Sequence, residues 1–148
     1  MRKRQQFREL LYRIELLKRK KVQNFLLEIG LTPGQGQARI LSFLSAHPGV
    51  TQREIADACM LDVTTMSRVI DRMQEKGLLK KERDPGCRRA CRVELTEEGE
   101  EKAEQVKERF RELEDQMCSG IPDSEITMLI EKLGKIEKNL TEGMTDRK

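Results

Sequence analysis

Aromatic residues are scarce in this 148-residue chain, which has no tryptophan, one tyrosine and four phenylalanines. Proteins that bind single-stranded nucleic acid stack its bases on aromatic rings, so the composition argues against that class. The one histidine, His47, stands directly before Pro48, and the sequence has no glycine-rich phosphate loop, metalloprotease motif or serine-nucleophile motif. We therefore expect no catalytic site, no metal site and no cofactor.

Long apolar runs are also absent, because no segment approaches the run of about 20 apolar residues that crosses a bilayer. The basic start, Met1 to Arg4, is followed by charged residues and not by the apolar region of a signal peptide. We therefore expect a cytoplasmic protein without a membrane segment. The cysteines are accordingly interpreted as reduced thiols and not as a disulfide framework; they are Cys59, Cys87, Cys91 and Cys118.

Charge is distributed unevenly along the chain, although the net charge is only +3. Residues 1–21 have a net charge of +7 and residues 76–92 of +5, whereas residues 94–133 have −8. The basic middle predicts a polyanionic partner, and the shortage of aromatic residues favours a duplex. The basic N-terminal segment has two interpretations: a helix on an anionic membrane surface, or a dimer arm with a solvated face.

Helix signals organise the first part of the chain. Apolar residues recur on one helical face from residue 7 onward, and Gly30 ends that helix. Thr32, with Gln35 reaching back to it, is expected to cap a second helix, which stops before Pro48. The residues that this second helix should bury are Ile40, Leu41 and Leu44.

A helix-turn-helix is predicted next. Thr51 begins a short helix with a capping-box pattern, and the inner face of this helix should be Ile55, Ala58 and Cys59. After a three-residue turn, apolar positions from 66 to 73 recur at i, i+3, i+4 and i+7. The other face carries Thr64, Thr65, Ser67, Arg68 and Arg72. Such a face is typical of a recognition helix in a DNA major groove; the competing interpretation is an ordinary solvated face.

A basic β-hairpin is predicted directly after this helix. Residues 78–83 and 90–95 have strand patterns, with a turn sequence at 84–86. The tip holds Arg88 and Arg89. Because arginine at such a tip can enter the minor groove, where negative potential is concentrated, the hairpin is interpreted as a wing.

Several motifs between Leu31 and Gly99 stand in a definite order. They are Leu31-Thr32, Thr51-Gln52-Arg53-Glu54-Ile55-Ala56, Thr64-Thr65-Met66-Ser67-Arg68-Val69-Ile70-Asp71-Arg72-Met73, Lys76-Gly77-Leu78-Leu79, Arg88-Arg89 and Leu95-Thr96-Glu97-Glu98-Gly99. In this order and spacing, the segment resembles the MarR family of winged helix-turn-helix transcriptional regulators. The resemblance implies a homodimer on a pseudo-palindromic operator, usually a repressor that a small molecule or oxidation releases.

The resemblance also implies which residues contact double-stranded DNA. Base contacts fall on Thr64, Thr65, Ser67 and Arg68, and a phosphate contact falls on Arg72. Backbone contacts fall on Gln52 and Arg53, and the wing tip contributes Arg88 and Arg89, of which Arg89 enters the minor groove. The family usually has an aspartate two residues before that arginine, where this chain has Cys87. Either the wing is looser, or Asp84 takes over the pairing.

Cys87 and Cys91 stand on either side of the wing arginines. A neighbouring cation stabilises a thiolate, so oxidation of these cysteines would give a redox switch on the wing. The competing interpretation is that Cys91 faces the inside of the hairpin and Cys87 fills its turn.

Apolar stripes with helical spacing flank the winged helix. They run over residues 7–17, 103–117 and 126–140. Their extent favours a homodimer, which would place two recognition helices about 34 Å apart; alternatively, the helices cover one another within one chain. The expected fold is mainly α with a small β-hairpin wing, comprising a dimerisation helix over 1–30, the winged helix-turn-helix over 31–96 and dimerisation helices over 97–148.

These features together predict a sequence-specific transcriptional regulator that binds DNA as a homodimer, and the resemblance implies a small-molecule effector. Two alternatives stay open: a thiol-based redox regulator, and a winged-helix module that binds an acidic protein. The predicted recognition face has no aromatic residue. Because protein-binding hot spots are rich in aromatic side chains, this favours DNA as the partner.

Overall fold

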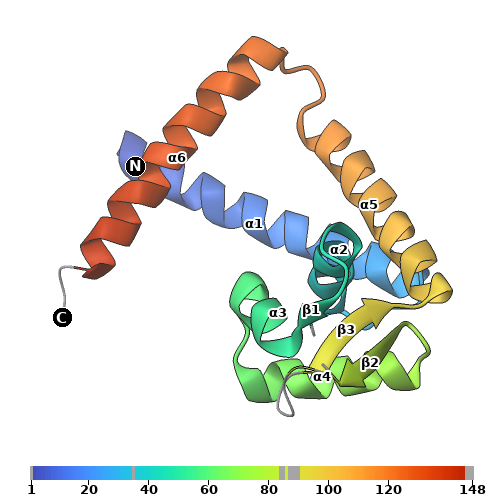
Figure 1. Cartoon of the computed structure of the whole chain (residues 1–148). Helices are drawn as coiled ribbons and strands as arrows, with labels where there is room; N and C mark the ends of the chain where they lie inside the picture. Colours follow the sequence, from blue (N-terminus) through green and yellow to red (C-terminus); the bar gives the residue numbers. More distant parts are fainter. Residues whose placement is uncertain (1, 35, 84–85, 87–90, 146–148) are drawn as a thin grey trace. The chain divides into compact units, whose positions relative to one another are not determined.

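The computed structural model describes residues 2–34, 36–83, 86 and 91–145. The chain is mainly α-helical with one small antiparallel sheet, as the sequence predicts (Figure 1). In chain order the elements are α1 (Lys3–Glu28), α2 (Gln37–Ala46), β1 (Val50–Thr51), α3 (Gln52–Cys59), α4 (Val63–Glu75), β2 (Leu79–Arg83), β3 (Cys91–Leu95), α5 (Glu97–Met117) and α6 (Asp123–Thr145).

Two compact units make up the chain, residues 1–111 and residues 112–148. The first unit holds α1 to α4, the sheet and most of α5, and the second holds the end of α5 and α6. None of the described helices is apolar over a length that could cross a membrane.

The core of the winged helix lies where α2, α3 and α4 contact one another and the sheet. Its buried helical residues are Ile40, Leu41, Leu44, Ile55, Ala56, Cys59, Met66, Val69, Ile70 and Met73. One expectation is wrong, since Ala58 is exposed and Ala56 is buried. Both alanines lie about equally far round the helix from the line through Ile55 and Cys59, so only the packing of α3 against its neighbours decides between them. Each buried Ile, Leu, Val or Met side chain stabilises this core by about 1.5–3 kcal/mol.

Three antiparallel strands form the sheet in the order β1-β3-β2. Strands β2 and β3 are the predicted hairpin, with Arg83 opposite Cys91. Val93 is fully buried, whereas Cys91 and Leu95 are half-buried. Strand β1 pairs Val50 with Val93. It is not predicted from the sequence, because two residues are too few to show strand alternation.

Helix α2 begins later than predicted. Its N-cap is Gly36, so Thr32 does not cap it, and Gln35 lies outside the described residues. Gly34 and Gly36 have φ values of +79° and +73°, a left-handed conformation that a helix starting at Thr32 could not contain. The Thr32 amide instead donates a hydrogen bond of 3.2 Å to Oε1 of the buried Gln37. Residues 32–34 and Gly36 therefore lie outside the helix.

The last turns of α1 pack against α5. The rings of Phe25 and Phe110 meet edge to face with centroids 5.0 Å apart, and Arg109 donates to the Glu28 carboxylate at 2.6 Å. An edge-to-face pair adds about 0.5–1.5 kcal/mol to the effect of burial alone. These contacts join the end of α1 to the helix that follows the wing.

The apolar stripes of the flanking helices are covered unequally. On α5 the stripe is buried at Ala103, Val106 and Leu113. The exposed large apolar residues of α1 are Phe7, Leu10, Leu11, Tyr12, Ile14, Leu16, Leu17 and Leu27, and those of α6 are Met128, Leu129, Ile130, Leu133 and Leu140. Each unit, taken by itself, therefore presents an uncovered apolar helix face.

Candidate nucleic-acid interface

The predicted recognition helix, α4, begins at an aspartate cap. The Asp62 carboxylate accepts hydrogen bonds from the Thr65 amide at 2.8 Å and from the Thr65 hydroxyl at 2.7 Å. These bonds hold the pKa of Asp62 below its ordinary value, because both favour the ionised carboxylate. The charge also lies at the positive end of the helix dipole. The cap, which the sequence analysis did not identify, therefore fixes the backbone at the leading end of α4.

The turn before α4 has three residues, as predicted. Met60 has a φ of +55°, which reverses the chain, and the Leu61 amide donates to the Ala56 carbonyl at 3.1 Å. At the other end of α4, Gly77 has a φ of +78°, and its amide donates to the Gln74 carbonyl at 3.0 Å. Both ends of the helix are therefore defined by specific backbone contacts.

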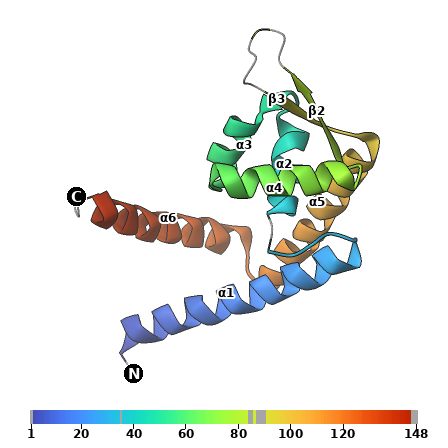
Figure 2. The same ribbon diagram turned by 90° about the horizontal axis from the view of Figure 1, so that it is seen from below.

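The outer face of α4 is accessible. Thr64, Arg68 and Arg72 are exposed, and Ser67 is half-buried. Thr65 is exposed too, but its hydroxyl donates its hydrogen to Asp62, so its oxygen can act toward a base only as an acceptor. Figure 2 shows α4 lying across one side of the winged helix, with α2 and α3 behind it. All the predicted residues of this helix therefore lie on an open surface or at its border.

Gln52 and Arg53 occupy the first turn of α3. The Thr51 hydroxyl caps this helix by accepting from the Glu54 amide at 3.2 Å, as the capping-box pattern predicts. Arg53 is exposed and Gln52 is half-buried. The amides of a helix N-terminus together with a guanidinium are suited to a phosphate group.

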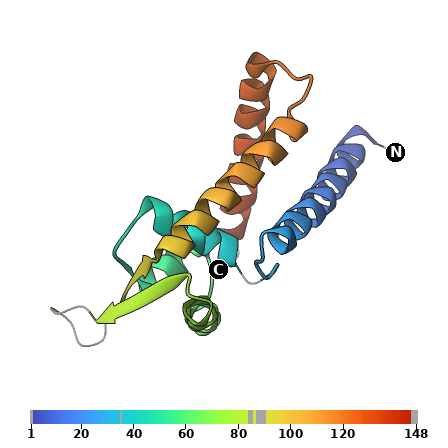
Figure 3. The ribbon, with the colours of Figure 1, turned by 90° about the vertical axis from the view of Figure 1, so that its right-hand side faces the viewer.

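An ion pair joins α4 to the wing. The Lys81 ammonium on β2 donates to the Asp71 carboxylate, which lies three residues beyond Arg68 on the exposed side of α4. Figure 3 looks along α4 and shows β2 beside it. Lys81 thus balances a negative charge that would repel a DNA phosphate. The sequence analysis missed this contact, because it depends on how the hairpin packs against the helix.

The predicted wing tip lies outside the described residues, at Asp84, Cys87, Arg88, Arg89 and Ala90. Of the other cysteines, Cys91 is a half-buried free thiol at the start of β3. Cys59 is a buried core residue, as predicted, and burial raises the pKa of its thiol. Cys118 is half-buried and lies one residue beyond the end of α5.

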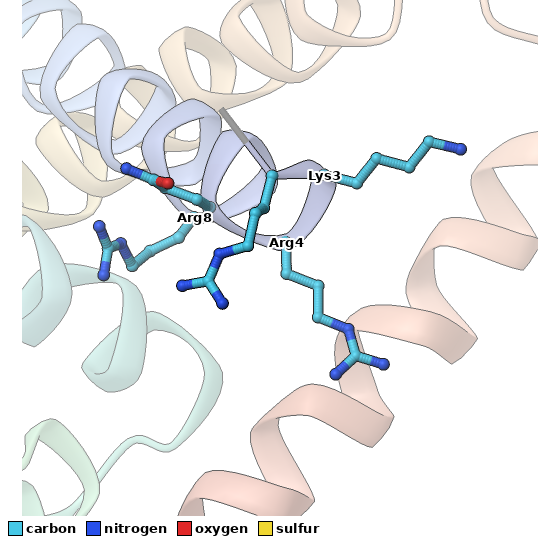
Figure 4. A pocket seen from close by; sticks show the side chains of 5 residues that line it. Lys3, Arg4 and Arg8 are labelled. Atoms are coloured by element: carbon cyan, nitrogen blue, oxygen red, sulfur yellow. The ribbon is translucent and has the colours of Figure 1, made fainter.

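Cationic side chains gather at the start of α1. Arg2, Lys3, Arg4, Gln5 and Arg8 line an open hollow of about 490 Å³. Figure 4 shows Lys3, Arg4 and Arg8 extending away from the helix. The first turn of α1 contains no acidic residue, although cations are unfavourable at the positive end of a helix dipole. The basic segment seen in the sequence is therefore exposed.

A second hollow, of about 480 Å³, lies between the loop before α2 and the helices α1 and α5. Its lining includes the apolar side chains of Leu26 and Phe110 and the polar side chains of Thr32 and Arg39. The Thr32 hydroxyl also accepts a hydrogen bond of 3.1 Å from Lys76, the residue that ends α4. The loop before α2 therefore both lines this hollow and bonds to the residue at the end of α4.

Known proteins share this architecture. A MarR-family transcriptional regulator from Silicibacter pomeroyi is 27% identical over 88% of this chain and 86% of its own, with a TM-score of 0.70. The transcriptional repressor CouR, solved with a 23-mer DNA duplex, is 25% identical over 86% of this chain and 89% of its own, with a TM-score of 0.75. MepR from S. aureus, solved in complex with DNA, has the same fold, with a TM-score of 0.80 at 24% identity over 90% of this chain and 97% of its own.

The amino-acid sequence also matches a family model. The family model described as the MarR family matches residues 29–90, which include α2, α3, α4 and β2. This is the segment that carries the capped helix, its polar outer face and the first wing strand. Over residues 29–90, the winged helix of this chain is similar to that of the MarR family of transcriptional regulators.

Proposed function

We propose that this protein is a homodimeric repressor that binds a pseudo-palindromic operator in the cytoplasm and that a small-molecule effector releases it. The observation that carries the proposal is the exposed face of α4, where hydroxyl and guanidinium groups stand side by side on a helix held at both ends. Such side chains read base edges in the major groove. The similarity to CouR, which was solved bound to duplex DNA, supports the same use of this face.

The proposed homodimer rests on the uncovered apolar faces of α1 and α6. Contiguous exposed apolar surface on a helix marks an interaction site, because it stays in contact with water until another surface covers it. A second copy of the chain offers the same faces, and two-fold symmetry makes them self-complementary. Two α4 helices would then lie about one DNA turn apart, which suits a palindrome.

The proposed effector site is the 480 Å³ hollow beside the loop before α2. It combines apolar walls with one guanidinium, from Arg39, so we expect a small apolar molecule with an anionic group. Thr32 connects the lining to α4 through Lys76. A ligand that displaces this loop would therefore disturb the end of the recognition helix.

The first experiment is a selection of random duplex DNA with the full chain at physiological salt, under reducing conditions and after mild oxidation. An enriched inverted repeat is expected and would give the operator. No enrichment would count against a sequence-specific regulator and favour a protein partner. Loss of the repeat after oxidation alone would favour a redox switch involving Cys87 or Cys91, whereas unchanged enrichment would contradict it.

Two arginines of α4 are predicted to act differently. Arg68→Ala should lower affinity for the operator by about tenfold or more while leaving random duplex nearly unaffected, since a bidentate base contact contributes about 1–3 kcal/mol of discrimination. Arg72→Ala should weaken binding to every sequence and reduce the salt slope by about 0.9 for each phosphate that is no longer neutralised. Titrations by fluorescence anisotropy at several salt concentrations measure both effects.

Arg111→Ala serves as the matched control, because Arg111 lies on α5 and pairs with Glu108 at 3.2 Å. It removes the same charge from a surface away from α4 and should leave operator binding unchanged. Equal losses on operator and random DNA for Arg68→Ala would show that Arg68 contacts phosphate and does not read a base.

A further inference from the structure

Two strongly exposed apolar side chains lie beside the leading end of α4. Met60 is 85% exposed and Val63 is 70% exposed. Among the described residues between 31 and 96, these two are the exposed large apolar side chains. The other exposed large apolar side chains of the described chain lie on the flanking helices or in the turn before α6. Isolated exposed apolar residues are common. These two, however, stand at the end of the helix that, under the proposed function, enters the major groove.

Val63 is held rigidly at this position. It is the first residue of α4 and directly follows the cap, Asp62, whose two hydrogen bonds to Thr65 span it. Valine is branched at Cβ and has few rotamers, so little side-chain entropy is lost when its methyl groups make a contact. Nothing in the folding of α4 requires an apolar residue here, since the buried face is made by Met66, Val69 and others.

A thymine methyl group is the apolar feature that a major groove offers. Of the four bases, thymine alone presents a methyl group at the groove floor, and apolar side chains discriminate A·T pairs by contacting it. The neighbouring Arg68 supplies only polar contacts, and Thr64 carries one methyl group beside a hydroxyl, whereas Val63 offers two methyl groups and no polar atom. We propose that Val63 is a specificity-determining residue that packs against the 5-methyl group of a thymine in each half-site. This inference rests on the proposed function, because it requires α4 in the major groove.

Met60 does not share this role. It lies in the turn before the cap, outside the helix, and its left-handed backbone directs the chain from α3 to α4. Its side chain has three rotatable bonds, so ordering it against a base edge costs more entropy. Met60 is therefore the matched control: an exposed apolar residue three positions away from Val63.

Deoxyuridine substitution tests the proposal directly, because deoxyuridine differs from thymidine only by the missing methyl group. Each thymine of the selected operator is replaced in turn, symmetrically in both half-sites, and binding is measured by fluorescence anisotropy. For the unmodified protein, we expect one position where the replacement weakens binding by about fourfold per half-site, the factor for one buried methylene-sized group. Val63→Ala should abolish the difference at that position, and Met60→Ala should retain it.

Three results would overturn the proposal. The first is binding that is insensitive to every deoxyuridine replacement, which would leave the regulator intact and Val63 without a thymine. The second is a sensitive thymine that stays equally sensitive in Val63→Ala, or loses its sensitivity in Met60→Ala, which would assign the contact to another residue. The third is no binding to any selected duplex, which would overturn the proposed function as well. Thermal melting of each variant confirms that both substitutions leave the protein folded.

Discussion

At Gly99 the backbone of α5 runs so close to Leu78, the residue directly before β2, that no side chain fits. A Cβ atom there would lie 1.8 Å from the Leu78 carbonyl oxygen. The Thr96 hydroxyl accepts from the Gly99 amide at 3.1 Å, which caps α5 at the point where the wing ends. A glycine that looks like a helix defect in the sequence is thus required by a close approach of two backbones.

Gly99→Ala is therefore predicted to lower the free energy of unfolding by about 1–3 kcal/mol, the usual range for overpacking a close contact. Urea titration followed by circular dichroism measures the change. Glu101→Ala, an exposed position two residues later, is the control and should shift stability by no more than about 0.5 kcal/mol. Equal stability of Gly99→Ala and the parent would contradict the close approach.

Asp62 makes the stability of α4 depend on pH. Its pKa in the folded protein is below the ordinary value of 3.8, because the Thr65 amide and hydroxyl both donate to its carboxylate. The stability that the ionised Asp62 cap gives to the fold is therefore fully present above pH 3.8, the ordinary pKa. It is lost as the pH falls from there through the lower pKa of the folded protein. The two bonds go to different carboxylate oxygens, and Asp62→Asn replaces one of these oxygens by an NH₂ group, which donates and cannot accept.

We expect the parent protein to be more stable than Asp62→Asn at pH 7, and this advantage to shrink as the pH falls below 3.8 toward the lower folded pKa. Paired denaturant titrations at pH 7, 5, 4 and 3 measure the difference. A difference that stays constant across this range would show that the ionised carboxylate is not the stabilising species.

Among the elements, the turn between α3 and α4 carries strain. Of the described residues other than glycine, only Met60 has a positive φ. A left-handed conformation costs an L-residue about 1–2 kcal/mol. The turn nevertheless sets the angle at which α4 leaves α3, since both helices pack into the same core. The strain is offset by the burial of residues on either side.

Met60→Gly is predicted to raise the free energy of unfolding by about 0.5–1 kcal/mol. Removing Cβ relieves the left-handed strain, and the greater freedom of glycine in the unfolded chain cancels part of the gain. Met60→Ala keeps the Cβ and should show no such gain in the same thermal melts. A glycine variant no more stable than the alanine variant would argue against backbone strain at this turn.

At the scale of the whole molecule, the exposed apolar helix faces bear on the proposed dimer. Phe7, Leu10 and Ile14 recur with helical spacing on α1 and are all exposed. The proposed dimer covers such faces, and only a dimer gives two recognition helices the spacing of a palindrome. DNA binding and assembly should therefore fail together when this face is changed.

Leu10→Glu is predicted to raise the dimer dissociation constant by at least about 100-fold, because an uncompensated buried carboxylate costs about 3–5 kcal/mol. Sedimentation velocity measures the assembly, and operator binding should weaken in parallel. Gln5→Glu adds the same charge to the same helix at a polar position and should leave both unchanged. A Leu10→Glu protein that still sediments as a dimer would place the interface elsewhere.

Local sequence patterns determined most of the secondary structure of the winged helix. The buried faces of α2 and α4, the cap of α3, the three-residue turn and the β2–β3 hairpin all follow from residue spacing and turn chemistry. These features depend on neighbours within a few residues, which the sequence contains explicitly. The polar outer face of α4 follows in the same way, since it is what remains after the apolar face is buried.

Only the tertiary structure decided the features that join distant segments. Strand β1 exists because β3 provides its hydrogen-bond partners. The capping pattern at Thr32 does not form a helix, because two left-handed glycines follow it. Ala56 is buried instead of Ala58 because of the elements that pack on α3. The pairing of Lys81 with Asp71 and the close approach at Gly99 are of the same kind. A local pattern records which groups a segment can offer, whereas the partner of each group depends on the packing of the whole chain.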